Sequence, residues 1–160
     1  MGSVKEIEII KKATDTAAGE GEFVFSDRYS VFDWGEMPDH IDGKGAALAT
    51  LSSYFFEVLE KNGIGSHFIG LMEDGRPKKF SELKSYSNKM RVKILRVIKP
   101  AYNKEKNTYD YSNYAGVKNN YLISLEVIYR NELPEGSSVF KRLKSGSTTY
   151  RDLGLDKEPK

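Results

Sequence analysis

The sequence of 160 residues contains no cysteine and only two histidines. Without thiols the chain forms no disulfide and offers no thiolate ligand to a metal, a composition typical of proteins in the reducing cytoplasm. His40 and His67 lie far apart in the sequence. We therefore expect packing or surface roles for both histidines, and we predict no metal ligands.

The sequence also has no large excess of positive or negative charge, and it has no long hydrophobic run. The chain has 25 basic and 23 acidic residues, a net charge of +2, which does not indicate a nucleic-acid-binding protein. No segment approaches the roughly 18 continuous apolar residues of a membrane span. The first residues, MGSVKEIEII, lack the apolar core of a signal peptide. We expect a cytoplasmic chain without membrane or nucleic-acid partners, with single-stranded RNA binding by the Tyr- and Lys-rich residues 99–120 as an alternative.

The composition is that of a globular protein, with 39% hydrophobic and 12% aromatic residues. Its length predicts a single domain over residues 1–160. Alternating β-branched and aromatic residues predict strands at 4–12, 22–27, 66–73 and 89–98. The first two strands are expected to form a hairpin around Gly19 and Gly21. A further strand is predicted over 121–130, with Tyr121, Ile123 and Leu125 on its core face.

The clearest helix is predicted over residues 46–63. Leucines and phenylalanines recur there at steps of three and four residues and form one apolar stripe, which comprises Leu48, Leu51, Phe55 and Leu59. Residues 28–45 are expected to form a long ordered loop, and residues 99–120, which show no periodicity, an insertion or flap. The predicted fold class is α+β, with a mostly antiparallel sheet and one long helix.

The tripeptide Gly43-Lys44-Gly45 stands immediately before the predicted helix. The first turn of a helix has unpaired N–H groups and its dipole favours anions, while glycines let a ligand approach and the lysine adds charge. An ordinary glycine-rich helix start explains the same pattern. From these residues alone, both interpretations stay open.

Four carboxylates gather in the segment before that tripeptide, at Asp27, Asp33, Glu36 and Asp39. Such a cluster is suited to bind amines, hydroxyls or Mg²⁺. Turn-forming and capping roles are the alternative, which we favour for Glu36 and Asp39. Asp33 lies between Phe32 and Trp34, and a shielded acid is expected to have a partner.

The stretch EVIYRNELPEGSSVFKRL, from Glu126 to Leu143, combines a predicted strand end with a turn and several cations. Glu126 and Arg130 fall on the same strand face. Arginine offers a planar fork for phosphate or carboxylate, and the turn at Ser137 and Ser138 offers N–H groups and hydroxyls. A hairpin with solvent-facing cations is the alternative interpretation of these residues alone.

Taken together, these stretches resemble one family. FSDRYSVFD, then GKG leading into YFFEVLEKNGI and HF, then LEVIYRN and GSSVFKRL occur in the order found in phosphoribosylaminoimidazole-succinocarboxamide synthases, or SAICAR synthetases. The resemblance covers residues 23–143, with residues 99–120 as an insertion. It implies an ATP-grasp-like amino-terminal lobe and a ligase of purine biosynthesis. Such an enzyme joins L-aspartate to carboxyaminoimidazole ribotide and releases ADP and phosphate, and it uses ATP and Mg²⁺. Assembly into a homo-oligomer is compatible with this resemblance.

Carried over position by position, the resemblance implies two groups of binding residues. The residues that match the family's ribotide-binding positions, or border them, are Arg130, Ser137, Ser138, Lys44, Gly45 and Asp33. The residues assigned to the nucleotide are Lys11, Lys12, Lys93 and Glu126.

The sequence departs from the family pattern in two places. The family's first hairpin carries a Gly-Lys-x-Lys loop over the ATP phosphates, whereas here Lys11 and Lys12 precede glycines at 19 and 21. The family's Mg²⁺-holding Asp-Glu-x-Ser-Pro-Asp stretch is absent. We therefore expect the amino-terminal part of such a ligase, inactive by itself. The alternative is a non-catalytic ribonucleotide-binding or regulatory module derived from the same family.

Overall fold

The computed structural model describes residues 5–31, 34–125, 131–157 and 159. The chain divides into two compact units, Met1–Ser124 and Leu125–Lys160. Within the described ranges, no helix combines the length and the apolar character needed to cross a lipid bilayer.

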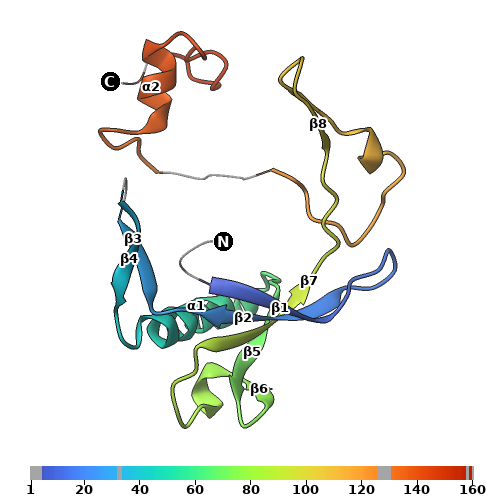
Figure 1. The fold of residues 1–160 in the computed structure, drawn as a ribbon, viewed down its shortest axis with the longest axis vertical. Helices are drawn as coiled ribbons and strands as arrows, with labels where there is room; N and C mark the ends of the chain where they lie inside the picture. Colours follow the sequence, from blue (N-terminus) through green and yellow to red (C-terminus); the bar gives the residue numbers. More distant parts are fainter. Residues whose placement is uncertain (1–4, 32–33, 126–130, 158, 160) are drawn as a thin grey trace. The chain divides into compact units, whose positions relative to one another are not determined.

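A five-stranded antiparallel sheet forms the centre of the first unit (Figure 1). Its strands, in spatial order, are β1 (Lys5–Lys11), β2 (Gly19–Phe25), β7 (Lys89–Ile94), β5 (Phe68–Glu73) and β6 (Arg76–Lys78). The predicted strands at 4–12, 22–27, 66–73 and 89–98 correspond to β1, β2, β5 and β7. The hairpin of β1 and β2 is confirmed, although its two glycines lie inside β2 rather than in the turn. The α+β class with a mostly antiparallel sheet is also confirmed.

The predicted long helix is α1 (Lys44–Lys61), which packs on one face of this sheet. Alternate residues of β2, β5 and β7 point toward it and exclude water together with the helix. The fully buried hydrophobic residues of this core are Phe25, Ala49, Phe68, Leu71, Met90 and Val92. Leu48 and Phe56 of α1 are partly buried against them.

The face that α1 buries differs from its apolar stripe. The buried positions recur every four residues at Gly45, Ala49 and Ser53, whereas Leu51 and Phe55 are each 56% exposed. Small side chains face the sheet because the helix backbone comes very close to β2. The periodicity thus predicted the helix but pointed to the wrong side of it.

The described residues within 28–45 form two paired strands and the start of α1 rather than one long loop, so that prediction was wrong. Strand β3 (Arg28–Val31) pairs with β4 (Gly35–His40) in a separate two-stranded sheet. Polar contacts hold the pair, with Arg28 bonded to Glu36 at 3.4 Å and Tyr29 donating to Asp39 at 2.9 Å. The missing signal was hydrophobic alternation, because this hairpin buries little. Both carboxylates thus make contacts between the two strands, which differ from the turn-forming and capping roles that we favoured for them.

The insertion at residues 99–120 contains a second small hairpin, of β8 (Ala101–Asn103) and β9 (Thr108–Asp110), followed by a 3₁₀ turn, Ser112–Tyr114. After it, residues 121–125 form no strand apart from one bridge between Tyr121 and Arg96. Ile123 and Leu125 are 63% and 69% exposed. The predicted strand and its core face are therefore wrong over 121–125, and the rest of it lies outside the described residues.

In the second unit, the helix α2 (Ser138–Lys144) follows the Pro-Glu-Gly-Ser turn. Ser137 caps the helix, since its Oγ accepts a hydrogen bond from the N–H of Val139 at 3.3 Å. Lys141 and Arg142 lie in the last turn of α2, where the helix dipole favours cations. The described part of this stretch, residues 131–143, thus forms a turn and a short helix where a hairpin would have its second strand.

Candidate functional site

A charged row crosses the sheet on the face opposite α1. In the ladders between β1, β2 and β7, Lys11 lies opposite Glu20, and Glu20 lies opposite Lys93. Residues directly opposite one another point to the same face of a sheet. The structure therefore brings two of the lysines assigned to the nucleotide onto one face, although they come from strands far apart in the sequence.

The next row on this face contains an ion-pair network that the sequence analysis missed. Arg91 contacts Glu22 at 3.2 Å and Glu20 at 3.5 Å, and Lys89 contacts Glu22 at 3.3 Å. The Arg91 and Glu22 side chains are only 19% and 8% exposed. The sequence signal for this network is that cations alternate in KMRVK and glutamates alternate in EGEFV. This signal becomes informative only when the pairing of the two strands is known.

Lys11 and Lys93 are exposed and belong to none of the ion pairs formed by the described residues. Arg91 and Lys89, in contrast, have carboxylate partners. The two exposed lysines are thus the cations of this face best placed to meet a phosphate. Lys12 lies just beyond β1 and is also exposed.

The β1–β2 turn, residues 12–18, follows these lysines directly. The N–H of Thr14 donates to the carbonyl of Ala17 at 2.9 Å, and the Thr14 Oγ1 accepts from the N–H of Ala17 at 3.0 Å. Gly19, the first residue of β2, follows the turn. A larger residue does not fit at this position, because a Cβ there would lie 2.3 Å from the Lys11 carbonyl oxygen. The turn is a tight hydrogen-bonded bend, which replaces the glycine-rich loop of the family pattern.

The start of α1 is occupied by a carboxylate of the protein itself. Asp27 accepts hydrogen bonds from the N–H of Gly45 at 2.7 Å and of Gly43 at 3.0 Å. These bonds, the one from Gly45 first, hold the pKa of Asp27 below its ordinary value. Because these two N–H groups are already paired, they are not free to bind an anion, and the half-buried Lys44 side chain supplies a positive charge here. Any ligand role of this lysine stays a prediction.

Gly45 is explained by packing. A Cβ at this position would lie 2.5 Å from the carbonyl oxygen of Phe25, closer than real atoms approach one another. Glycine is therefore the residue that lets α1 sit on β2. This structural role accounts for Gly45 without a ligand.

In the second unit, the two serines assigned to the ribotide lie at the start of α2. Ser137 is buried and its hydroxyl oxygen is used as the cap, while Ser138 is the first residue of the helix and is exposed. Asp33, Glu126 and Arg130 lie outside the described residues. Their assignments stay predictions.

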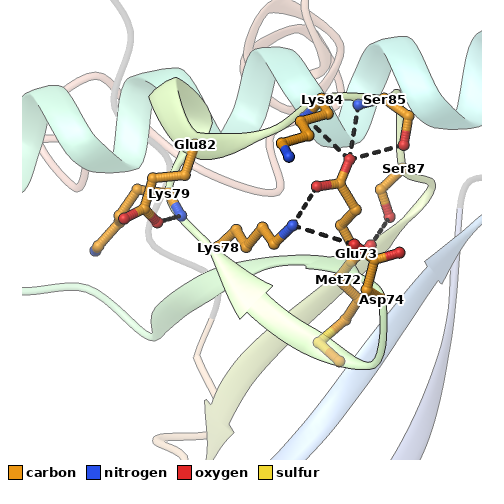
Figure 2. Close-up of polar contacts among 9 residues, drawn as sticks. All are labelled: Met72, Glu73, Asp74, Lys78, Lys79, Glu82, Lys84, Ser85 and Ser87. Atoms are coloured by element: carbon orange, nitrogen blue, oxygen red, sulfur yellow. Dashed lines mark hydrogen bonds and ion pairs between the residues drawn. The ribbon is translucent and has the colours of Figure 1, made fainter.

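Glu73 is a buried carboxylate that the sequence analysis did not select. Figure 2 shows that it accepts bonds from Lys78, at 2.5 Å, and from the segment that follows β6. Within that segment the donors are the N–H of Lys84, at 3.0 Å, and the N–H and hydroxyl of Ser85, at 2.7 and 2.8 Å. The bond from Lys78 contributes most to lowering the pKa of Glu73 to about 2. Glu73 therefore anchors this segment. Because its pKa is so low and both of its oxygens already accept hydrogen bonds, it is unsuited to act as a general base.

A groove of about 650 Å³ runs along the outer side of α1. Its walls are the exposed residues of the helix, such as Leu51 and Tyr54, together with Phe80 and Tyr86 from the segment that Glu73 anchors. The lining carries few polar groups. Over the described ranges, no group of three or more His, Cys, Asp or Glu side chains is arranged to hold a metal ion.

The fold and this face define an α+β lobe, with a helix on one side of an antiparallel sheet and a charged row on the other. The family model of SAICAR synthetase matches residues 10–154, and the chain belongs to this family. A protein of Archaeoglobus fulgidus, provisionally named phosphoribosylaminoimidazole-succinocarboxamide synthase, is 48% identical over 98% of this chain and 45% of its own length. The phosphoribosylaminoimidazole-succinocarboxamide synthase of Thermoplasma volcanium is 31% identical over 86% of this chain and 37% of its own length.

The chain thus spans less than half the length of these two relatives. Among solved structures, a type-2 SAICAR synthetase in complex with ADP is similar, with a TM-score of 0.45 and 19% identity over 96% of this chain and 60% of the other.

Proposed function

We propose that this chain contributes the nucleotide-binding face of a phosphoribosylaminoimidazole-succinocarboxamide synthase. The observation that carries the proposal is the row in which Lys11 and Lys93 flank Glu20 on the face opposite α1. Membership of the SAICAR synthetase family supports the activity, which joins L-aspartate to carboxyaminoimidazole ribotide.

The proposed reaction has two steps. The ribotide carboxylate oxygen attacks the γ-phosphorus of ATP and ADP departs, which forms an acyl phosphate. The aspartate amine then attacks the acyl carbon, phosphate departs, and the nitrogen loses a proton. Such chemistry depends on clamped phosphates and stabilised charge. In our proposal Lys11, Lys12 and Lys93 supply positive charge to the ATP phosphates, with Glu126 as a further nucleotide residue.

The ribotide is assigned to the second set of residues. We propose that Arg130 and Ser138 meet its phosphate, with Ser137 shaping the turn and Lys44 and Asp33 bordering the substrate. The family also uses Mg²⁺, but the described residues offer no cluster of metal ligands, so we assign no step of the mechanism to a metal site in this chain.

We expect Lys93→Met to weaken ATP binding about 10- to 150-fold. The variant keeps the length of the side chain but removes a charged contact, which is worth roughly 1.5–3 kcal/mol when it is made to a phosphate. Calorimetric titration with ATP measures the change. Lys104→Met, an exposed lysine in the β8–β9 turn, is the matched control and should bind as the unaltered chain does. Equal affinities of the two variants would contradict the assignment of Lys93.

For the ribotide, we expect Arg130→Ala to cost about 1.5–3 kcal/mol of binding free energy, because one charge-assisted contact is lost. Titration of carboxyaminoimidazole ribotide into both proteins measures it, with Arg151→Ala as a control at an exposed arginine. Unchanged binding in Arg130→Ala would remove Arg130 from the site. Release of ADP by this chain that requires both ribotide and aspartate would exclude the non-catalytic alternative and would contradict the expectation that the chain is inactive by itself.

A further inference from the structure

The β1–β2 turn is contacted by a residue from a distant part of the chain. The side-chain amide of Asn120 donates to the carbonyl oxygen of Asp15 at 3.3 Å, across 105 residues of sequence. In Figure 1 the end of the β1–β2 hairpin and the chain that returns from the β8–β9 hairpin lie side by side in this region. The insertion therefore reaches the turn that directly follows Lys11 and Lys12.

The backbone at Asn120 is held from both sides. The N–H of Arg96 donates to the carbonyl of Asn120, and the N–H of Leu122 donates to the carbonyl of Arg96, both at 2.9 Å. The guanidinium of Arg96 also donates to the carbonyl of Asn119 at 3.1 Å. Asn120 has a φ of 51°, a left-handed conformation that asparagine adopts more readily than most residues. The chain that leaves β7 thus fixes the direction of the Asn120 side chain.

Tyrosine and asparagine side chains join the two ends of the insertion. The ring of Tyr114 lies 5.7 Å from that of Tyr121, and its hydroxyl donates to the carbonyl of Ile98. Asn113 donates from its side chain to the carbonyl of Lys99 at 2.6 Å. These contacts join the outgoing and returning segments of the insertion next to Asn120. The side-chain amide of Asn120 is therefore attached to a segment that several hydrogen bonds hold in place.

The turn offers a fitting acceptor. Its internal hydrogen bonds join Thr14 to Thr16 and to Ala17, whereas the carbonyl of Asp15 accepts from Asn120. Without that bond, the carbonyl of Asp15 would lose the partner that the insertion supplies, and a short exposed turn of this kind opens easily.

We propose that Asn120 is a positioning residue that holds the β1–β2 turn, and with it Lys11 and Lys12, in place for the nucleotide phosphates. This inference rests on the proposed function of that face. It assigns a role to the insertion that the family resemblance leaves unexplained.

The test compares Asn120→Asp and Asn120→Gly with the unaltered chain. Both variants tolerate the left-handed conformation, but both lack the amide donor. We expect the backbone amides of residues 13–18 to exchange with deuterium about 3- to 10-fold faster, the effect of losing one neutral hydrogen bond. ATP binding should weaken by a similar factor, while ribotide binding stays unchanged. Asn119→Ala, at an exposed neighbour, is the matched control and should leave both readouts unchanged.

Native exchange rates in the turn of both variants would overturn the inference. Faster exchange together with unchanged ATP affinity would overturn the positioning role, because it would show that order in the turn does not affect nucleotide binding. Failure of ATP to bind the unaltered chain would refute the proposed function itself. That result is separate from the exchange measurement, which needs no nucleotide.

Discussion

Gly45→Ala is expected to lower the free energy of unfolding by about 3 kcal/mol, the upper range for overpacking a core. The new Cβ would lie 2.5 Å from the carbonyl oxygen of Phe25 and 2.9 Å from its carbonyl carbon. Both atoms belong to the backbone of β2, so the helix must move as a whole. Such a shift also disturbs the bond from the N–H of Gly45 to Asp27.

The sign of this effect makes the experiment decisive. In an open helical position, alanine is about 1 kcal/mol more favourable than glycine. Urea denaturation of Gly45→Ala measures the change, and Gly65→Ala is the matched control, because a Cβ at Gly65 meets nothing within 4 Å. The control is expected to stay within about 0.5 kcal/mol of the unaltered chain. A Gly45→Ala variant as stable as the unaltered chain would mean that α1 does not approach β2 in this way.

Glu73→Gln is expected to lower the melting temperature at pH 7 by about 5–10 °C, a range typical of a lost buried polar network in a small domain. Whichever way the amide turns, its NH₂ group faces donors, either the ammonium of Lys78 or the N–H groups of Lys84 and Ser85. The segment after β6, which carries Phe80 and Tyr86, then loses its anchor (Figure 2). Thermal unfolding followed by circular dichroism measures the change.

The pH dependence gives a second, independent signature of Glu73. Its pKa is lowered from an ordinary 4.5 to about 2 in the folded chain, so the unfolded state binds the proton more readily. The stabilisation is therefore complete above pH 4.5 and is lost as the pH falls toward 2. Glu73→Gln should flatten the melting-temperature profile over this interval.

Asp74→Asn is the matched control for Glu73, since Asp74 contacts the same lysine at 3.3 Å but its side chain is 82% exposed. An exposed ion pair contributes little to stability. The control should therefore retain the profile of the unaltered chain. An equally steep acid transition in Glu73→Gln would show that another group is responsible.

The positions of the strands and of α1 were largely predictable because their patterns are local. Alternation marked β1, β5 and β7, and three- and four-residue steps marked α1. The same reasoning missed the β3–β4 hairpin, whose strands are held by polar contacts such as that of Tyr29 with Asp39. It also placed a buried strand at 121–125, where Ile123 is 63% exposed. Hydrophobic periodicity reports burial, and it fails where strands bury little or where apolar residues face outward.

For the candidate site, the sequence indicated candidate residues but did not show how they lie relative to one another. Lys11 and Lys93 were selected from a resemblance of motifs, yet their common face follows from the pairing of β2 with both β1 and β7. Asp27 was recognised only as one of several acids. Its bonds to Gly43 and Gly45 are formed when β2 and the start of α1 meet, and no local pattern specifies that meeting.

By itself the sequence determined most strands of the main sheet and the helix α1, the family through ordered motifs, and the types of side chain available to bind anions. The tertiary structure alone decided which of these side chains stay exposed and which are paired, because strand register and helix approach are set by long-range contacts. Burial of Phe25, Leu71 and Met90 on one face of the sheet leaves the charged row on the other. The close contact at Gly45 and the reach of Asn120 to Asp15 follow from the same packing.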